Sequence, residues 1–190
     1  MADDKLIDQK AAIRKQLKQI RASIPAPVRK AYSETIFNSL IGLEEIIHAS
    51  SVFIYISYEN EVDTHHLLKY FLKQGKSIAV PKILASKIMI AVPFTGWDEL
   101  IAGELGILTP AGEEPFKTAI DIVITPGLGF TRTGYRIGYG RGYYDKWFAR
   151  NSVAHKIAVT FEAQIMDSLP VAVTDIPVDI IVTEQRTIRI

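Results

Sequence analysis

Apolar residues recur along the first part of the chain at the spacing of an α-helix. Between Asp4 and Ile24 they stand seven, four, three and four positions apart, which places them on one face of a helix that ends at Pro25. A second amphipathic pattern begins at Val28 and continues into the Glu44–His48 region. The first quarter of the chain is therefore predicted to be helical.

The pattern then changes to short runs of β-branched and aromatic residues that alternate with helical segments. Such runs predict buried strands, and they lie at 51–57, 77–81, 89–94, 120–125, 156–161 and 179–183. Helical patterns lie between them at 64–74, 97–102 and 143–150. The alternation predicts one α/β domain over residues 1–190. It has an open, mainly parallel sheet with helices on both faces, a Rossmann-like arrangement of three layers.

In such a sheet the ligand crevice lies beyond the carboxyl ends of the strands. The segment 126–145 follows a predicted strand and holds six of the 12 glycines and four of the 8 tyrosines, together with Arg132, Arg136 and Arg141. Backbone N–H groups of a glycine-rich loop can surround an anion, and arginine binds phosphate oxygens bidentately. The segment therefore predicts a phosphate-binding loop, in which Asp145 could hold Mg²⁺ against the same phosphates.

Two well-known phosphate-binding patterns do not match this segment. The G-x-G-x-x-G fingerprint would need its third glycine at position 143, which is Tyr143, and the pattern G-x-x-x-x-G-K-[ST] is absent from the sequence. The alternative to a phosphate-binding loop is that segment 126–145 is only a long glycine-rich turn, with its arginines in solvent.

Three further groups of polar residues have a structural explanation beside the functional one. Lys10 and Arg14 lie one helical turn apart, and such a pair is usually only a solvated face. The acids of segment 57–64 either form a site at the end of a strand or favour the N-terminus of the next helix. Asp175 could reach a metal ion, whereas Asp179 fits the start of the last buried strand.

Composition narrows the possible functions. The 190 residues include no cysteine, which excludes disulfides, thiolate metal sites and cysteine nucleophiles. The formal net charge of +1 disfavours general nucleic-acid binding. No apolar run approaches the roughly 20 residues of a membrane span. We expect a cytoplasmic monomer with neither a nucleic acid nor a membrane as partner.

The motifs and their order resemble the 5-formyltetrahydrofolate cyclo-ligase family, also known as methenyltetrahydrofolate synthetases. The most specific motif is Arg136-Ile-Gly-Tyr-Gly-Arg-Gly-Tyr-Tyr-Asp145, and the Lys10-x-x-x-Arg14 helix and the 57–64 segment are weaker matches. The resemblance covers nearly the whole chain. It implies conversion of 5-formyltetrahydrofolate to 5,10-methenyltetrahydrofolate with ATP and Mg²⁺. The formyl oxygen would be phosphorylated, and ADP and phosphate would be released.

The resemblance also implies which residues bind each ligand. ATP would be bound by Lys10, Arg14, Arg136, Ile137, Gly138, Tyr139, Gly140, Arg141, Gly142, Tyr143 and Tyr144. The folate would be bound by Tyr58, Glu61, Asp63, Tyr139, Gly140, Arg141, Gly142 and Tyr143, with either Glu61 or Asp63 facing the pterin. Asp145 and Asp175 would hold Mg²⁺.

Two other classes of function stay open on the sequence. A small-molecule kinase could use the same phosphate loop, but it would leave the phosphate on its substrate. A non-catalytic module could bind RNA or nucleotides through the arginines and tyrosines, with strongly salt-dependent affinity and no turnover of ATP.

Overall fold

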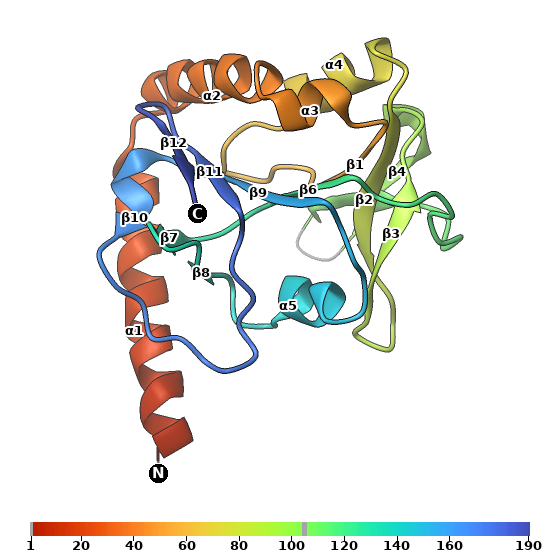
Figure 1. Cartoon of the computed structure of the whole chain (residues 1–190). Helices are drawn as coiled ribbons and strands as arrows, with labels where there is room; N and C mark the ends of the chain where they lie inside the picture. The colour runs from red at the N-terminus through yellow and green to blue at the C-terminus, as the bar shows by residue number, and fades with distance from the viewer. Residues whose placement is uncertain (1, 104–105) are drawn as a thin grey trace.

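A seven-stranded sheet forms the centre of the protein in the computed structural model, which describes residues 2–103 and 106–190 (Figure 1). Its strands are β1 (Ser51–Ile54), β2 (Ser77–Ile83), β3 (Met89–Pro93), β6 (Ile122–Thr125), β9 (His155–Val159), β11 (Ile180–Val182) and β12 (Thr187–Arg189). The spatial order is β12-β11-β9-β6-β1-β2-β3. Neighbours from β11 to β2 are parallel, and the two edge strands are antiparallel.

Helices lie on both faces of this sheet. They are α1 (Ala2–Ser23), α2 (Ala26–Ile41), α3 (Glu44–His48), α4 (His65–Lys73) and α5 (Tyr143–Phe148). In Figure 1, α2, α3 and α4 lie above the sheet and α5 lies below it, while α1 runs down one side of the molecule. The predicted three-layer α/β arrangement is confirmed.

Several short elements complete the fold. A three-stranded sheet joins β10 (Ile165–Met166), β7 (Gly129–Thr131) and β8 (Arg136–Ile137), and it lies beside α1 (Figure 1). A hairpin pairs β4 (Leu100–Ala102) with β5 (Leu108–Pro110). Single 3₁₀ turns cover Trp97–Glu99 and Glu162–Gln164.

Two of the predicted helices are wrong in extent or type. The segment 97–102 forms a 3₁₀ turn followed by β4, because its chain folds back at Gly103, whose N–H donates to the Ile107 carbonyl at 2.8 Å. The second helix does not continue into the Glu44–His48 region. It ends at Ile41, and Leu43 has extended backbone geometry before α3 begins.

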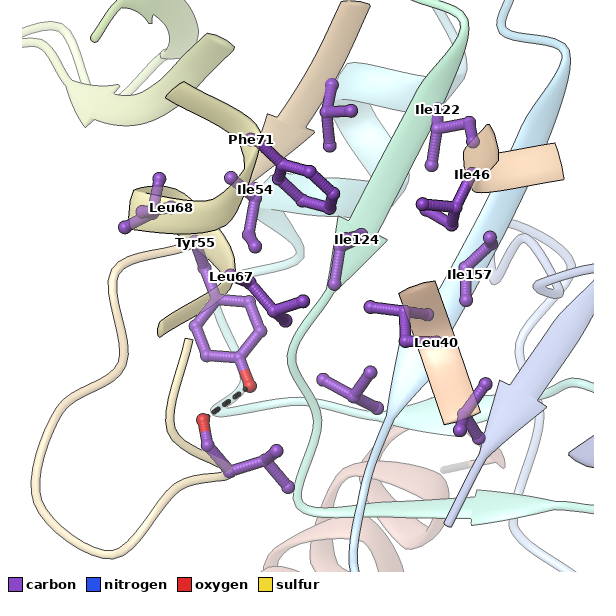
Figure 2. Close-up of a cluster of buried hydrophobic side chains, with 14 of the residues drawn as sticks. Leu40, Ile46, Ile54, Tyr55, Leu67, Leu68, Phe71, Ile122, Ile124 and Ile157 are labelled. Carbon is purple, nitrogen blue, oxygen red and sulfur yellow. Dashed lines mark hydrogen bonds between the residues drawn. The ribbon is translucent and has the colours of Figure 1, made fainter. Parts of the chain in front are cut away.

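Side chains of the central strands alternate between two separate cores. Figure 2 shows the core beneath α2, α3 and α4, where Ile124 of β6 lies between Ile54 of β1 and Ile157 of β9. The residue before Ile124, Val123, belongs to the other core. Because both faces are covered, consecutive positions in the middle of these strands are apolar, which explains why the sequence shows continuous apolar runs there.

The core below the sheet is built on aromatic rings. Phe53 of β1 is completely buried, and its ring centroid lies 4.9 Å from that of Trp147 and 6.1 Å from that of Tyr144, both on α5. Such aromatic packing contributes beyond the buried area alone. It fastens the short helix α5, and therefore the loop that precedes it, to the sheet.

Helix α1 packs against the small sheet through an apolar cluster centred on Leu17, with Ile13 and Ile20 of the same helix beside it. Leu17 is completely buried and packs with Leu128 and Ile137. A Cβ atom added to Gly129 would lie 2.5 Å from Leu17 Cδ1, so a larger residue at this position would force the Leu17 side chain out of its present place. The absence of a side chain at Gly129 therefore sets how closely α1 approaches the strands.

Within residues 2–103 and 106–190, we find no helix that combines the length and the apolar character needed to cross a membrane.

Replacing Phe53 with alanine should lower the free energy of unfolding by about 3–5 kcal/mol, because it removes the ring at the centre of the α5 core and leaves a cavity. Urea unfolding followed by circular dichroism measures this change. Ile47→Ala is the matched control, since Ile47 is 53% exposed and should change stability by less than about 0.5 kcal/mol. Equal losses for the two variants would contradict this account of the core.

Candidate active site

The predicted site residues gather where three segments of the chain meet. These segments are α1, the loop after β1 at residues 55–64 (the acid loop) and the loop between β8 and α5 at residues 138–142 (the glycine loop). Tyr139 and Glu61 are 78 positions apart in the sequence, yet their side chains share a hydrogen bond. The fold therefore brings together motifs that are scattered along the chain.

Glu61 is the buried acid of this site. Its side chain is 10% exposed, and it accepts hydrogen bonds from the Tyr139 hydroxyl at 2.6 Å and from the Tyr58 backbone N–H at 3.1 Å. Burial raises the pKa of Glu61 above its usual value of 4.5, although the Tyr139 hydroxyl and Arg21 oppose this rise. The carboxylate is thus an acceptor inside the protein, with a cation nearby.

Arg21 supplies that cation from the last turn of α1. It is 4% exposed, and its guanidinium donates from Nε to Asn60 Oδ1 and from Nη2 to the Tyr139 hydroxyl, both at 2.8 Å. Nη1 lies 3.7 Å from Glu61 Oε1. Sequence reasoning missed this residue. The signal that could have found it is its spacing, since Arg21 follows Arg14 by two helical turns and shares its face.

Tyr139 connects the glycine loop to this cluster. Its hydroxyl accepts from Arg21 and donates to Glu61, and Lys18 Nζ lies 5.6 Å from the centroid of its ring. Burial raises the pKa of Tyr139, and the negative charge of Glu61 raises it further. The hydroxyl therefore stays protonated and acts as a donor.

Asp63, the other candidate acid, has a different set of partners. Its Oδ1 accepts the His65 backbone N–H at 2.8 Å at the start of α4, and its own N–H donates to Ser33 Oγ at 3.1 Å. Of the two acids, Glu61 contacts the glycine loop and Asp63 caps a helix. The structural explanation for the acidic segment therefore applies to Asp63, and Glu61 stays the candidate site residue.

Arg14 joins α1 to the other side of the glycine loop. Its Nε donates to the Gly138 carbonyl at 2.9 Å, and its guanidinium lies against Gly140. Within the part of the chain that the structure describes, the backbone N–H groups of residues 139–141 donate to no protein acceptor. Unpaired backbone donors beside a guanidinium form the kind of surface that binds an anion.

Lys10 and Asp175 form an ion pair across 165 positions of sequence. Lys10 Nζ lies 2.5 Å from Asp175 Oδ2, and the same oxygen accepts the Ala172 backbone N–H at 2.8 Å. The two side chains are 16% and 17% exposed. Lys10 therefore does not belong to a solvated helix face, which is the usual explanation for a pair of basic residues at this spacing.

Asp145 and Arg136 form a second ion pair. Arg136 Nη2 donates to Asp145 Oδ1 at 2.8 Å, and the Ile176 backbone N–H donates to the same oxygen at 3.0 Å. Arg136 Nη1 also donates to the Ile176 carbonyl at 2.6 Å, and its guanidinium lies 5.4 Å from the centroid of the Phe148 ring. Burial lowers the pKa of Arg136, and Asp145 opposes this effect.

These two carboxylates fit the ligand pattern of Mg²⁺. Within the described residues, Asp145 Oδ2 and Asp175 Oδ1 make no hydrogen bond to protein. The same residues contain no cluster of three or more histidine, cysteine or acidic side chains that could enclose a metal ion. Mg²⁺ commonly uses only one or two protein carboxylates, and substrate phosphates and water complete its shell.

The remaining residues of the predicted loop divide between core and surface. The side chain of Ile137 is buried beneath α1, whereas Arg141 is exposed. The Tyr144 hydroxyl is buried and has no hydrogen-bond partner among the described residues. A buried hydroxyl without a partner is unusual, and the ring that carries it packs against Phe53 and Phe148 in the α5 core.

A cavity of about 550 Å³ opens beside Tyr143, the first residue of α5. This volume lies in the range of small-molecule sites. Its lining combines apolar and basic side chains, among them Met89, Phe116, Trp147, Lys146 and Arg150.

The turn between β7 and β8 supports the segment that carries Asp175. Gly134 has a φ of 86°, and its carbonyl accepts the Val178 backbone N–H at 3.0 Å. A Cβ atom at this position would lie 2.5 Å from the Val178 carbonyl oxygen. Both the positive φ and the close approach require glycine here.

Comparisons with known proteins agree with this arrangement. A sequence profile of the 5-formyltetrahydrofolate cyclo-ligase family matches residues 6–184. The 5-formyltetrahydrofolate cyclo-ligase of Mus musculus is 29% identical over 194 residues, which cover 92% of this chain and 93% of the mouse protein. The probable 5-formyltetrahydrofolate cyclo-ligase of Caenorhabditis elegans is 25% identical over 194 residues and 94% of each chain.

Solved structures extend the likeness to three dimensions. The NMR structure of Aquifex aeolicus 5,10-methenyltetrahydrofolate synthetase is 30% identical, with a TM-score of 0.84 over 95% of this chain and 92% of that one. The 5,10-methenyltetrahydrofolate synthetase of Mycoplasma pneumoniae is 22% identical and shares the fold, with a TM-score of 0.73 over 92% of this chain and 98% of that one. The predicted fold, family and enzyme class are confirmed, and the chain belongs to the 5-formyltetrahydrofolate cyclo-ligase family.

Proposed function

We propose that this protein uses ATP and Mg²⁺ to convert 5-formyltetrahydrofolate to 5,10-methenyltetrahydrofolate, with ADP and phosphate as the other products. The observation that carries the proposal is the position of the glycine loop. Its first residue binds Arg14 through the Gly138 carbonyl, and the next residue, Tyr139, binds Glu61. One short loop therefore touches both a basic surface suited to phosphates and a buried acid suited to a pterin.

The folate would lie on the Glu61 side of the loop. A pterin ring presents neighbouring N–H donors, and a carboxylate can accept two of them at once. The flat rings that follow in the folate suit aromatic neighbours, and Tyr143, which directly follows the glycine loop, lines a cavity of about 550 Å³. The backbone N–H of Tyr58 already orients the carboxylate of Glu61 for this role.

The triphosphate would lie on the Arg14 side. The backbone N–H groups of residues 139–141 would donate to phosphate oxygens, and Lys10, Arg14 and Arg141 would neutralise their charge. Arg136 is bound to Asp145. Its contribution to nucleotide binding would therefore pass through the orientation of that carboxylate.

Asp145 and Asp175 would hold Mg²⁺ through the carboxylate oxygens that the protein leaves unbonded. The ion would neutralise the charge that develops on the transferred phosphoryl group. Arg136 and Lys10 each fix the other oxygen of one of these carboxylates. These two ion pairs would therefore orient Asp145 and Asp175 toward the metal ion.

The reaction needs no nucleophile from the protein. The formyl oxygen attacks the γ-phosphorus and ADP leaves, which gives a phosphorylated imine-like carbon on nitrogen-5. Nitrogen-10 then attacks this carbon and loses its proton, and phosphate departs with the former formyl oxygen. Alignment of two bound reactants can contribute on the order of 7–11 kcal/mol, and the shared loop would provide that alignment.

We further propose that the protein acts as a single-domain monomer in the cytoplasm. ATP and 5-formyltetrahydrofolate would be its partners, without nucleic acid or membrane. The net charge of +1 supports the absence of a nucleic-acid partner. A mitochondrial relative in Arabidopsis thaliana makes the compartment a separate question from the chemistry.

The direct test mixes the protein with 5-formyltetrahydrofolate and MgATP and follows the absorbance of the methenyl product. We expect absorbance and free phosphate to rise in equal amounts, and omission of ATP to abolish both. A kinase would instead leave phosphate on the folate and produce no methenyl absorbance. That result would contradict the proposed reaction.

Asp145→Asn should lower kcat by a factor of at least about 100, because the neutral amide removes a metal ligand worth several kcal/mol in the transition state. Asp167→Asn is the matched control, since Asp167 is exposed and should leave kcat unchanged. Thermal unfolding of both variants checks that the loss is not a loss of fold. A folded Asp145→Asn protein with full activity would refute the metal role.

The acid side of the pH profile should report Glu61. Burial raises its pKa, so the ionised acceptor is lost at a higher pH than for an ordinary glutamate with a pKa of 4.5. We expect kcat/KM for the folate to fall as the pH drops through this raised value. In Glu61→Gln the value should be low at every pH measured. An unchanged profile in that variant would assign the titration to another group.

A further inference from the structure

The Glu61 carboxylate already has partners that a pterin would have to replace. Oε1 accepts the Tyr139 hydroxyl at 2.6 Å, a short bond to a charged acceptor. The hydroxyl in turn accepts from Arg21 Nη2, so three side chains from three segments form one chain of hydrogen bonds. A pterin that binds Glu61 competes with the Tyr139 hydroxyl for the same oxygen.

Arg21 does not face the same competition. Its Nε is bound to Asn60, and its Nη1 lies 3.7 Å from Glu61 Oε1, a contact made directly and not through Tyr139. Because Arg21 is 4% exposed, its charge acts through protein rather than through water. Removing it would leave Glu61 buried without the nearby positive charge, and a buried acid without a partner becomes protonated.

We propose that Arg21 is a positioning residue for the folate, which keeps Glu61 as a carboxylate and presents the Tyr139 hydroxyl as a latch that the pterin displaces. This inference rests on the proposed role of Glu61 as the pterin acceptor. It adds a residue of α1 that touches neither substrate nor phosphate in this arrangement. It also assigns opposite effects to the two groups that contact Glu61.

The latch couples the two substrates. In the free protein Tyr139 fixes the glycine loop to the acid loop, while Arg14 fixes its other side through Gly138. Displacement of the hydroxyl by the pterin frees the loop to rearrange around phosphates. By linkage, a nucleotide that draws the loop away from Glu61 also exposes the acceptor to the folate.

The test measures the Kd of 5-formyltetrahydrofolate by calorimetry, with and without a non-hydrolysable ATP analogue. Arg21→Ala should raise this Kd by a factor of at least about 10, because it leaves a buried charge unpaired. Arg21→Lys should restore part of the affinity, since it keeps the charge but not the forked geometry. Tyr139→Phe keeps the ring and removes only the hydroxyl, so it should leave the Kd unchanged or lower it.

The ATP analogue adds a second readout. In the natural protein it should lower the Kd of the folate by a factor of about 5 or more. In Tyr139→Phe this factor should approach one, because no latch remains to be opened. A merely structural role for the cluster predicts instead that Tyr139→Phe weakens the folate as Arg21→Ala does, and that result would overturn the inference.

Lys15→Ala is the matched control, because it removes an exposed cation from the same helix and should change neither constant. Thermal unfolding identifies variants that fail to fold. If Arg21→Ala does not fold, Arg21→Lys and Tyr139→Phe test the inference instead. Arg21→Lys should still raise the Kd of the folate, whereas Tyr139→Phe should not. Turnover by the natural protein is measured in parallel. If it forms the methenyl product while the variants do not separate, this inference fails and the proposed function stands.

Discussion

The site depends on how closely α1 lies against the small sheet. Leu17 is buried in the space that Gly129 leaves open, and this contact sets the height of the helix above the strands. From that position, side chains one to two turns away on either side reach the ion pairs and loops of the site. These residues are Lys10, Arg14 and Arg21. The hydrophobic contact at Leu17 therefore determines where the three charged side chains on either side of it along α1 are placed.

The layers of this fold can be predicted from the sequence because its long helices show the 3.6-residue period and its buried strands show continuous apolar runs. The helical spacing of α1 and the apolar runs of β1, β6 and β9 survive in the structure. The small sheet was not foreseen, because β8 and β10 have two residues each and so carry no period. The helix expected at 97–102 failed for a related reason, since a six-residue segment cannot distinguish a helix from a turn and a strand.

The candidate site could be predicted only where its polar residues are grouped in one continuous segment of the sequence. The glycine loop and the acid segment each stand out alone, and each follows a strand. Which acid enters the site could not be read from sequence, because Glu61 and Asp63 differ only in the partners that the fold provides. Arg136 shows the same limit, since its partner Asp145 belongs to the same motif and takes it away from the surface.

The turn at Gly134 matters for the candidate site although it contributes no side chain to it. Hairpin turns usually accept substitutions readily, but this one is packed against Val178 and hydrogen bonded to it. The segment fixed in this way carries the Asp175 carboxylate and the Ile176 carbonyl that binds Arg136. A larger residue here would therefore act on the Asp175 carboxylate indirectly, by displacing the backbone that carries it, and would strain the fold at the same time.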